Sequence, residues 1–190
     1  MTQGQFLEAC YPRAIIDLMQ TAEAQEEPVQ REQTSDHSRR WLFFGAALTV
    51  VALDQATKIV VRSTLERGES WPGADWDVRI RYVTNTGASF GIFQDQTLFL
   101  TAMGLIGLLA IYLYYRFPPF DHFVVPIAIG MMLGGAAGNL IDRIVKGRVT
   151  DFMDFPHFPA FNVADSSISV GIAVILIGYL IWGQHQPSSE

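Results

Sequence analysis

Residues 98–115, LFLTAMGLIGLLAIYLYY, contain no charged side chain, end in a cluster of tyrosines and are followed by Arg116. An apolar helix of this length is long enough to cross roughly 30 Å of hydrocarbon. Aromatic and basic residues are enriched where such a helix meets the lipid headgroups. The stretch therefore predicts a transmembrane helix over residues 98–116 and places the chain among membrane proteins.

Three further segments have the length and the apolar character of membrane spans. The first is uncharged after Trp41 except for Asp54 and Lys58. The third contains Pro126, which a transmembrane helix tolerates because neighbouring helices can satisfy the freed carbonyl. Besides 98–116, we expect spans over about residues 41–61, 123–144 and 163–182. The predicted fold class is an all-α membrane protein with four transmembrane helices, which puts both termini on one side.

The segments that connect the spans predict a small sheet and a loop. Val78-Arg79-Ile80-Arg81-Tyr82 alternates apolar with basic residues, which is the period-two pattern of a half-buried strand. Residues 147–161 carry Pro156 and Pro159 among aromatic residues, which suits a short loop in the membrane interface. We therefore expect a small β-sheet on the membrane face and an interfacial loop.

The two ends of the chain lie outside the predicted four-span domain of residues 41–183. Residues 1–40 are polar and acid-rich, so they cannot bury much apolar surface and are expected to form a partly disordered tail. Apolar side chains near Ile15 could line a short helix there, and its secondary structure stays unassigned. Residues 184–190 form a short polar C-terminal end.

Composition excludes several classes of function. A net charge of −6 argues against nucleic-acid binding, which needs basic residues gathered on one face. The single cysteine, Cys10, excludes an internal disulfide. The four histidines are scattered and none belongs to an H-E-x-x-H helix, so no metal ion and no cofactor is expected.

Charged side chains are costly inside a bilayer, so those that occur there are usually paired and functional. Asp54 and Lys58 stand four residues apart on one helical face, as a structural ion pair or as part of a site. Asn139, Asp142 and Arg143 share one face of the third span, where Arg143 could be the partner of Asp142. They follow the run of small residues 134–138, which lets another helix or a substrate backbone approach closely.

Asp151 and Asp165 are the residues on which a catalytic prediction rests. Asp151 lies just past the end of the third span and Asp165 opens the fourth, so both acids reach the same membrane surface. Two carboxyls that converge in a poorly solvated place can share a proton, which is the logic of aspartic proteolysis. The alternative is that each aspartate caps a helix or pairs with a basic residue.

A serine nucleophile is the weaker catalytic hypothesis. Ser166 or Ser167 could be paired with Lys58. However, neither serine lies in a G-x-S-x-G elbow, and Lys58 already has Asp54 as a partner.

Five motifs taken together resemble the lipoprotein signal peptidases, the type II signal peptidases of bacterial membranes. The resemblance spans residues 41–183, and it is carried in order by Asp54-Gln55-Ala56-Thr57-Lys58, Asn85-Thr86-Gly87-Ala88-Ser89-Phe90, Gly134 to Arg143, Val149-Thr150-Asp151-Phe152 and Phe161-Asn162-Val163-Ala164-Asp165. Ser89 departs from the alanine that the family often has there, and the long acidic tail is the larger departure.

The resemblance implies an aspartic endopeptidase without a metal. Such an enzyme removes the signal peptide from diacylglyceryl-modified prolipoproteins, on the amino side of the lipidated cysteine. Asp151 and Asp165 match the family's catalytic pair, and Asp142 is the runner-up for Asp151 as the second acid. The positions that match substrate-contacting or pocket residues are Asn85, Gly87, Asn139, Arg143 and Asn162, and those that match supporting polar residues are Asp54, Lys58 and Asp142.

The resemblance also implies a place in the cell. It puts the protein in the bacterial cytoplasmic (inner) membrane, with both termini in the cytoplasm and the acids and the small sheet near the extracytoplasmic face. The expected partners are prolipoprotein substrates and membrane lipid, and the chain is expected to be a monomer. The distribution of lysine and arginine argues the other way, because Arg62, Arg67, Arg79, Arg81, Lys146 and Arg148 would then lie outside.

Two functions of other classes are alternatives to catalysis. A small transporter or channel could line an ion path with Asp54, Asp142, Asp151 and Asp165. A scaffold without catalysis would not depend on any of them.

Overall fold

The computed structural model describes the backbone of residues 13–73, 76–87, 96–118 and 122–182, and side chains from His37 to Ile181 within these ranges. The chain divides between Trp41 and Leu42 into two compact units. The functional residues predicted above all belong to the second unit.

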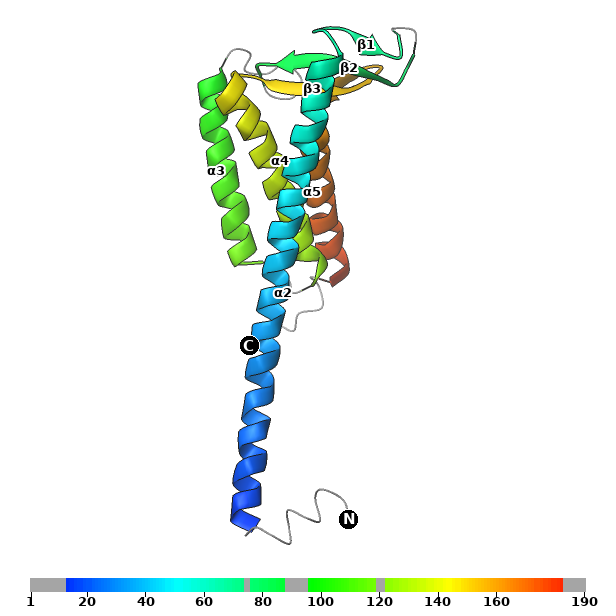
Figure 1. The fold of residues 1–190 in the computed structure, drawn as a ribbon. Helices are drawn as coiled ribbons and strands as arrows, with labels where there is room; N and C mark the ends of the chain where they lie inside the picture. The colour runs from blue at the N-terminus through cyan, green and yellow to red at the C-terminus, as the bar shows by residue number, and fades with distance from the viewer. Residues whose placement is uncertain (1–12, 74–75, 88–95, 119–121, 183–190) are drawn as a thin grey trace. The chain divides into compact units, whose positions relative to one another are not determined.

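The described residues form four helices, each of them long enough and apolar enough to cross a membrane. The helices are α2 (Arg13–Thr64), α3 (Thr97–Arg116), α4 (Val124–Lys146) and α5 (Val163–Trp182) (Figure 1). The candidate spans within them are His37–Thr64, Thr97–Arg116, Val124–Lys146 and Val163–Ile181. The predicted fold class is confirmed.

The tail differs from its prediction where the structure describes it. Helix α2 begins at Arg13, so residues 13–40 of the predicted tail are helical backbone. Glutamate, glutamine and alanine favour helices, and a segment that extends an existing helix needs no new nucleus. Residues 1–12 and 183–190, which include Cys10, lie outside the described residues.

A four-stranded antiparallel sheet lies at the end of the bundle where α4 ends and α5 begins (Figure 1). Its strands, in spatial order, are β1 (Ser70–Trp71), β2 (Arg79–Asn85), β3 (Val149–Phe155) and β4 (Phe158–Phe161). Strand β2 confirms the strand that the alternating apolar and basic residues predicted.

The predicted interfacial loop is wrong for most of its length. Residues 149–161 form the hairpin β3–β4, with the turn at Pro156 and His157, and His157 has a φ of 61°. The prolines and aromatic residues indicated a loop, but β3 pairs along its length with β2. This pairing satisfies the backbone of β3, and it joins segments far apart in the sequence that local pattern cannot connect.

The small residues of α4 bring three helices close together. A Cβ on Gly134 would lie 2.5 Å from the carbonyl oxygen of Ala47 on α2, and a Cβ on Gly135 would collide with the carbonyl oxygen of Ala164 on α5. The close-approach interpretation of residues 134–138 is therefore confirmed. It positions the polar residues that follow on α4 against α2 and α5.

We expect Gly134→Ala to lower the free energy of unfolding by about 1–3 kcal/mol, because the added methyl forces backbone apart in a packed interface. The matched control is Gly45→Ala on α2, where a Cβ would meet nothing within 4 Å. Thermal unfolding of the purified protein in detergent measures both variants. Equal unfolding temperatures for the two would contradict the packing described.

Candidate active site

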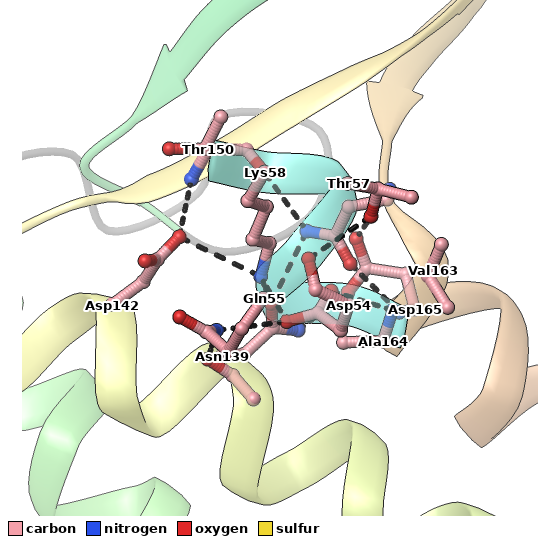
Figure 2. Close-up of polar contacts among 12 residues, drawn as sticks. Asp54, Gln55, Thr57, Lys58, Asn139, Asp142, Thr150, Val163, Ala164 and Asp165 are labelled. Atoms are coloured by element: carbon pink, nitrogen blue, oxygen red, sulfur yellow. Dashed lines mark hydrogen bonds and ion pairs between the residues drawn. The ribbon is translucent and has the colours of Figure 1, made fainter. Parts of the chain in front are cut away.

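A buried lysine organises the polar residues beneath the sheet. Lys58 and Asp54 are both fully buried, and Lys58 Nζ lies 2.8 Å from Asp54 Oδ2 (Figure 2). The same ammonium lies 3.5 Å from Asp142 Oδ2 and donates to Asn139 Oδ1 at 3.0 Å. The predicted pair of Asp54 and Lys58 is confirmed, and Lys58 also connects α2 to two residues of α4. Burial of these charges is sustained because each has a partner.

Asp142 forms ion pairs with cations other than Arg143, the partner that the sequence predicted. Its Oδ1 accepts a hydrogen bond from Arg62 at 3.1 Å, and its Oδ2 accepts one from the backbone N–H of Thr150 at 3.0 Å. Lys146 lies 3.5 Å away on the next turn of α4. Among the ion pairs of the described residues, none joins Asp142 to Arg143. Asp142 therefore ties α2 and α4 to the start of β3.

The side-chain amide of Asn139 connects Lys58 to Asp165. Its side-chain oxygen accepts from Lys58, so its amide nitrogen is turned the other way and donates to Asp165 Oδ1 at 2.8 Å. The orientation of this amide is fixed because an ammonium can only donate. A continuous path of hydrogen bonds thus runs from the buried lysine to the carboxylate at the start of α5.

Asn162 joins the two aspartates of the predicted pair. Its side chain donates to Asp151 Oδ1 at 2.6 Å, and its backbone N–H donates to Asp165 Oδ2 at 3.2 Å. The backbone N–H of Asp165 donates in return to Asn162 Oδ1 at 3.0 Å, which makes a reciprocal cap at the start of α5. The helix-cap alternative is therefore true of Asp165, and its carboxylate lies beside Asp151 at the same time.

Asp151 is a buried carboxyl on β3, where it pairs in register with Val83 of β2. Asn85, at the end of β2, donates to Asp151 Oδ2 at 3.1 Å. Burial, and then the negative charge of Asp165, raises the pKa of Asp151 to about 6, against the lowering effect of the hydrogen bonds from Asn85 and Asn162. This carboxyl keeps its proton more tightly than an ordinary aspartate does.

Both aspartates face one cavity of about 400 Å³ between the sheet and the helices. The wall is completed by Asn85, Gly87, Arg143, Phe158, Pro159, Ala160, Phe161, Ser166, Ser169 and Val170. The other predicted site residues, Asp54, Lys58, Asn139, Asp142 and Asn162, do not line this cavity and lie behind the pair. The arrangement can hold a polar group at the two carboxyls inside an otherwise largely apolar wall.

Residues 46–181 match the model of the family described as signal peptidase (SPase) II. This chain belongs to the signal peptidase II family.

Two relatives and one solved structure also support membership of this family. The chain is 39% identical over 144 residues to the lipoprotein signal peptidase of Shouchella clausii, covering 75% of this chain and 95% of the relative. It is 42% identical over 167 residues to that of Acaryochloris marina, covering 80% and 96%. A solved bacterial membrane enzyme superposes with a TM-score of 0.68 at 32% identity, over 76% of this chain and 91% of that one.

Sequence reasoning missed part of the peptidase's cavity wall. Strand β4 contributes Phe158 and Phe161, which were assigned to a loop. Ser169 and Val170 were missed too, although their spacing of four from Asp165 and Ser166 was a usable signal for one helical face. Within the motif of residues 85–90, Asn85 and Gly87 line the cavity, whereas residues 88–90, with Ser89, lie outside the described residues.

Two other chemistries find no support in the part of the peptidase that the structure describes. The hydroxyls of Ser166 and Ser167 donate to the carbonyls of Asn162 and Val163, and the ammonium of Lys58 is occupied by its own partners. No group of three or more histidine, cysteine, aspartate or glutamate side chains lies where it could hold a metal ion among the described residues.

Proposed function

We propose that this member of the signal peptidase II family is an aspartic endopeptidase of the membrane that removes the signal peptide from prolipoproteins. It cleaves on the amino side of the diacylglyceryl-modified cysteine, with Asp151 and Asp165 as the catalytic pair. The observation that carries the assignment is that Asn162 contacts both carboxyls while both line one cavity. The names of the relatives supply the substrate class.

The chemistry needs one carboxyl with a proton and one without. Asp151, whose pKa is raised to about 6, holds the proton and donates it to the carbonyl oxygen of the scissile bond. Asp165 then takes a proton from the attacking water, which adds to the carbonyl carbon. Asp165 then gives that proton to the leaving nitrogen, the carbon–nitrogen bond breaks, and the hydroxyl on the former carbonyl carbon returns its proton to Asp151 as the carbonyl forms again.

The remaining site residues hold the pair or meet the substrate. Asn139, Asn162 and the cluster of Lys58 with Asp54 and Asp142 fix the positions of the two carboxyls. Asn85, Gly87 and Arg143 lie on the cavity wall, where they can contact the peptide on either side of the scissile bond.

The proposed placement rests on the substrate and on the resemblance to the lipoprotein signal peptidases. A lipid-anchored cysteine stays at a membrane surface, and the resemblance implies the outer one. We therefore place the cavity near the extracytoplasmic face of the bacterial cytoplasmic membrane, with both termini of the chain in the cytoplasm. The protein acts as a monomer among membrane lipids. A reporter enzyme that is active only outside the cytoplasm, fused after Glu190, tests the placement, and activity from this fusion would reverse it.

A purified preparation should cleave a diacylglyceryl-modified precursor and leave the unmodified precursor intact. The same preparation in EDTA serves as the control for a contaminating metalloprotease. The products are identified by mass spectrometry. An intact lipid-modified precursor after incubation with folded enzyme would overturn the proposed function.

The pH profile of cleavage should report the proton on Asp151. Because its pKa is raised to about 6, we expect kcat/KM to fall as the pH rises through that value. Asn85→Ala removes a hydrogen bond to the ionised form, so the pKa rises and the alkaline limb moves to higher pH. The same shift affects stability. The protonated Asp151 carboxyl adds to the free energy of unfolding below about pH 4, and this contribution is lost as the pH rises through 6.

The control for this profile is Thr84→Ala, which changes the neighbouring residue of β2 and does not touch the cavity wall. Its profile should superpose on that of the unmodified enzyme. A limb that stays in place or moves to lower pH in Asn85→Ala would contradict the assignment of the proton to Asp151.

A further inference from the structure

A second cavity lies farther from the sheet, along α4 and α5, and α3 completes its wall. Its volume is about 320 Å³. Its wall is apolar apart from a tyrosine and includes Ala110, Ile111 and Tyr114 of α3, Met132 of α4, and Ile172 and Leu176 of α5. The two cavities therefore differ in character: the first carries two carboxyls, one amide and a guanidinium, and the second presents mainly hydrocarbon.

One face of α5 connects the two cavities. Asp165 and Ser169 line the first, and Ile172 and Leu176 line the second. These residues are spaced by four, three and four, which places them on the same side of a helix. At a rise of 1.5 Å per residue, Ser169 lies about 6 Å and Leu176 about 16 Å beyond Asp165 along the axis. The cavities lie one after the other, from the aspartate pair into the membrane-spanning part of the bundle.

Ser169 differs from the other hydroxyl residues of the described helices between Leu42 and Trp182. Every other serine and threonine there donates a hydrogen bond to a carbonyl, as Ser166 and Ser167 do on the same helix. The Ser169 hydroxyl has no such bond to any described residue, and it faces the first cavity. The Ser169 side chain is exposed, so its hydroxyl becomes costly only when a bound apolar group covers it, and a bound group that accepts its hydrogen bond is then favoured.

The lipid of the proposed substrate presents the same order of groups. From the scissile peptide bond, the modified cysteine continues through a thioether and a glyceryl segment to ester carbonyls, and then to hydrocarbon. A carbonyl accepts a hydrogen bond from a hydroxyl, and an acyl chain matches an apolar wall. Along α5 the order is a carboxyl, a free hydroxyl and then isoleucine and leucine.

We propose that Ser169 binds an ester carbonyl of the diacylglyceryl group and that the second cavity holds the acyl chain attached to it. This inference rests on the proposed function. It makes Ser169 a specificity residue that selects a lipid-modified cysteine, and it places the lipid beside α5 during cleavage.

The test compares lipopeptides that carry ester-linked or ether-linked chains, because an ether has no carbonyl to accept the hydrogen bond. Ser169→Ala should lower kcat/KM for the ester substrate by about fivefold, the size expected for one hydrogen bond, and should leave the ether substrate unchanged. Ser167→Ala is the matched control, because its hydroxyl binds the carbonyl of Val163 and lies outside the cavity wall. An equal loss on both substrates would overturn the role of Ser169.

A second pair of variants tests the acyl chain. Ile172→Trp fills the second cavity, so cleavage of a sixteen-carbon diacyl substrate should fall while cleavage of a diacetyl substrate is kept. Ile177→Trp, at an exposed position of α5 that lines neither cavity, is the control. An equal loss on both substrates in Ile172→Trp would assign the cavity to the signal peptide instead. Failure of the unmodified enzyme to cleave any substrate would instead remove the proposed function itself.

Discussion

Asp151→Asn should lower the rate of prolipoprotein cleavage by roughly a thousandfold, with the protein still folded. An amide has the shape of the carboxyl but can neither hold the proton that the carbonyl needs nor share it with Asp165. Asp165→Asn should have an effect of the same size, and the double variant should be no worse than either, because the two carboxyls act as one unit. Single-turnover cleavage of a purified lipid-modified precursor measures all three.

Asp154→Asn is the matched control, because Asp154 lies on the same strand as Asp151 and makes its ion pair with Arg79, away from the cavity. It should cleave at close to the normal rate. If Asp151→Asn retained more than about a tenth of the normal rate while remaining folded, the aspartic mechanism would be excluded.

The same measurement separates the runner-up acid from the proposed pair. Asp142 is neutralised by Lys58 and Arg62 and does not line the cavity. Its replacement by asparagine should therefore act through stability, with activity recovered at low temperature. Asp151→Glu separates the peptidase from a channel, since a conduit would tolerate a carboxylate with one more methylene and an aspartic pair would not.

The helices and the aspartate pair could be predicted because each rests on a local pattern. An uncharged stretch such as residues 98–115 determines its own helix once water is absent, since every backbone group must be satisfied within the segment. Asp151 and Asp165 flank one connection between two spans, so the crossing of the chain brings them to the same surface. Local pattern was enough for both.

Other features depend on contacts between distant parts of the chain. Strand β3 exists because β2 lies beside it, in a register that sets Thr84 against Thr150, and nothing within residues 147–161 encodes that pairing. Likewise, the sequence indicated Arg143 as a partner of Asp142, whereas the structure brings Arg62 from another helix. The Ser169 hydroxyl differs only in comparison with the other serines and threonines of the described helices, whose hydrogen bonds the sequence does not reveal.

Lys58→Met should be the most destabilising single change in the site, lowering the free energy of unfolding by about 3–5 kcal/mol. Methionine fills the space of the stem but leaves the Asp54 carboxylate buried without its cation. The Asp54 carboxylate also accepts the backbone N–H of Ala164 on α5, so its displacement would disturb the start of the helix that carries Asp165. Thermal unfolding in detergent measures the loss.

The double variant Asp54→Asn with Lys58→Met distinguishes a missing cation from a missing side chain. Removing the buried carboxylate removes the uncompensated charge, so the double variant should be more stable than Lys58→Met alone. Its cleavage rate should nevertheless stay below normal, because the side-chain oxygen of Asn139 keeps Asn162 as a donor but loses Lys58. The amide that donates to Asp165 is then held less firmly. The double variant should therefore recover stability without recovering catalysis.

If the double variant were no more stable than Lys58→Met, the ion pair would not be what holds α2 in place. If it cleaved at the normal rate, the path from Lys58 through Asn139 would not position Asp165.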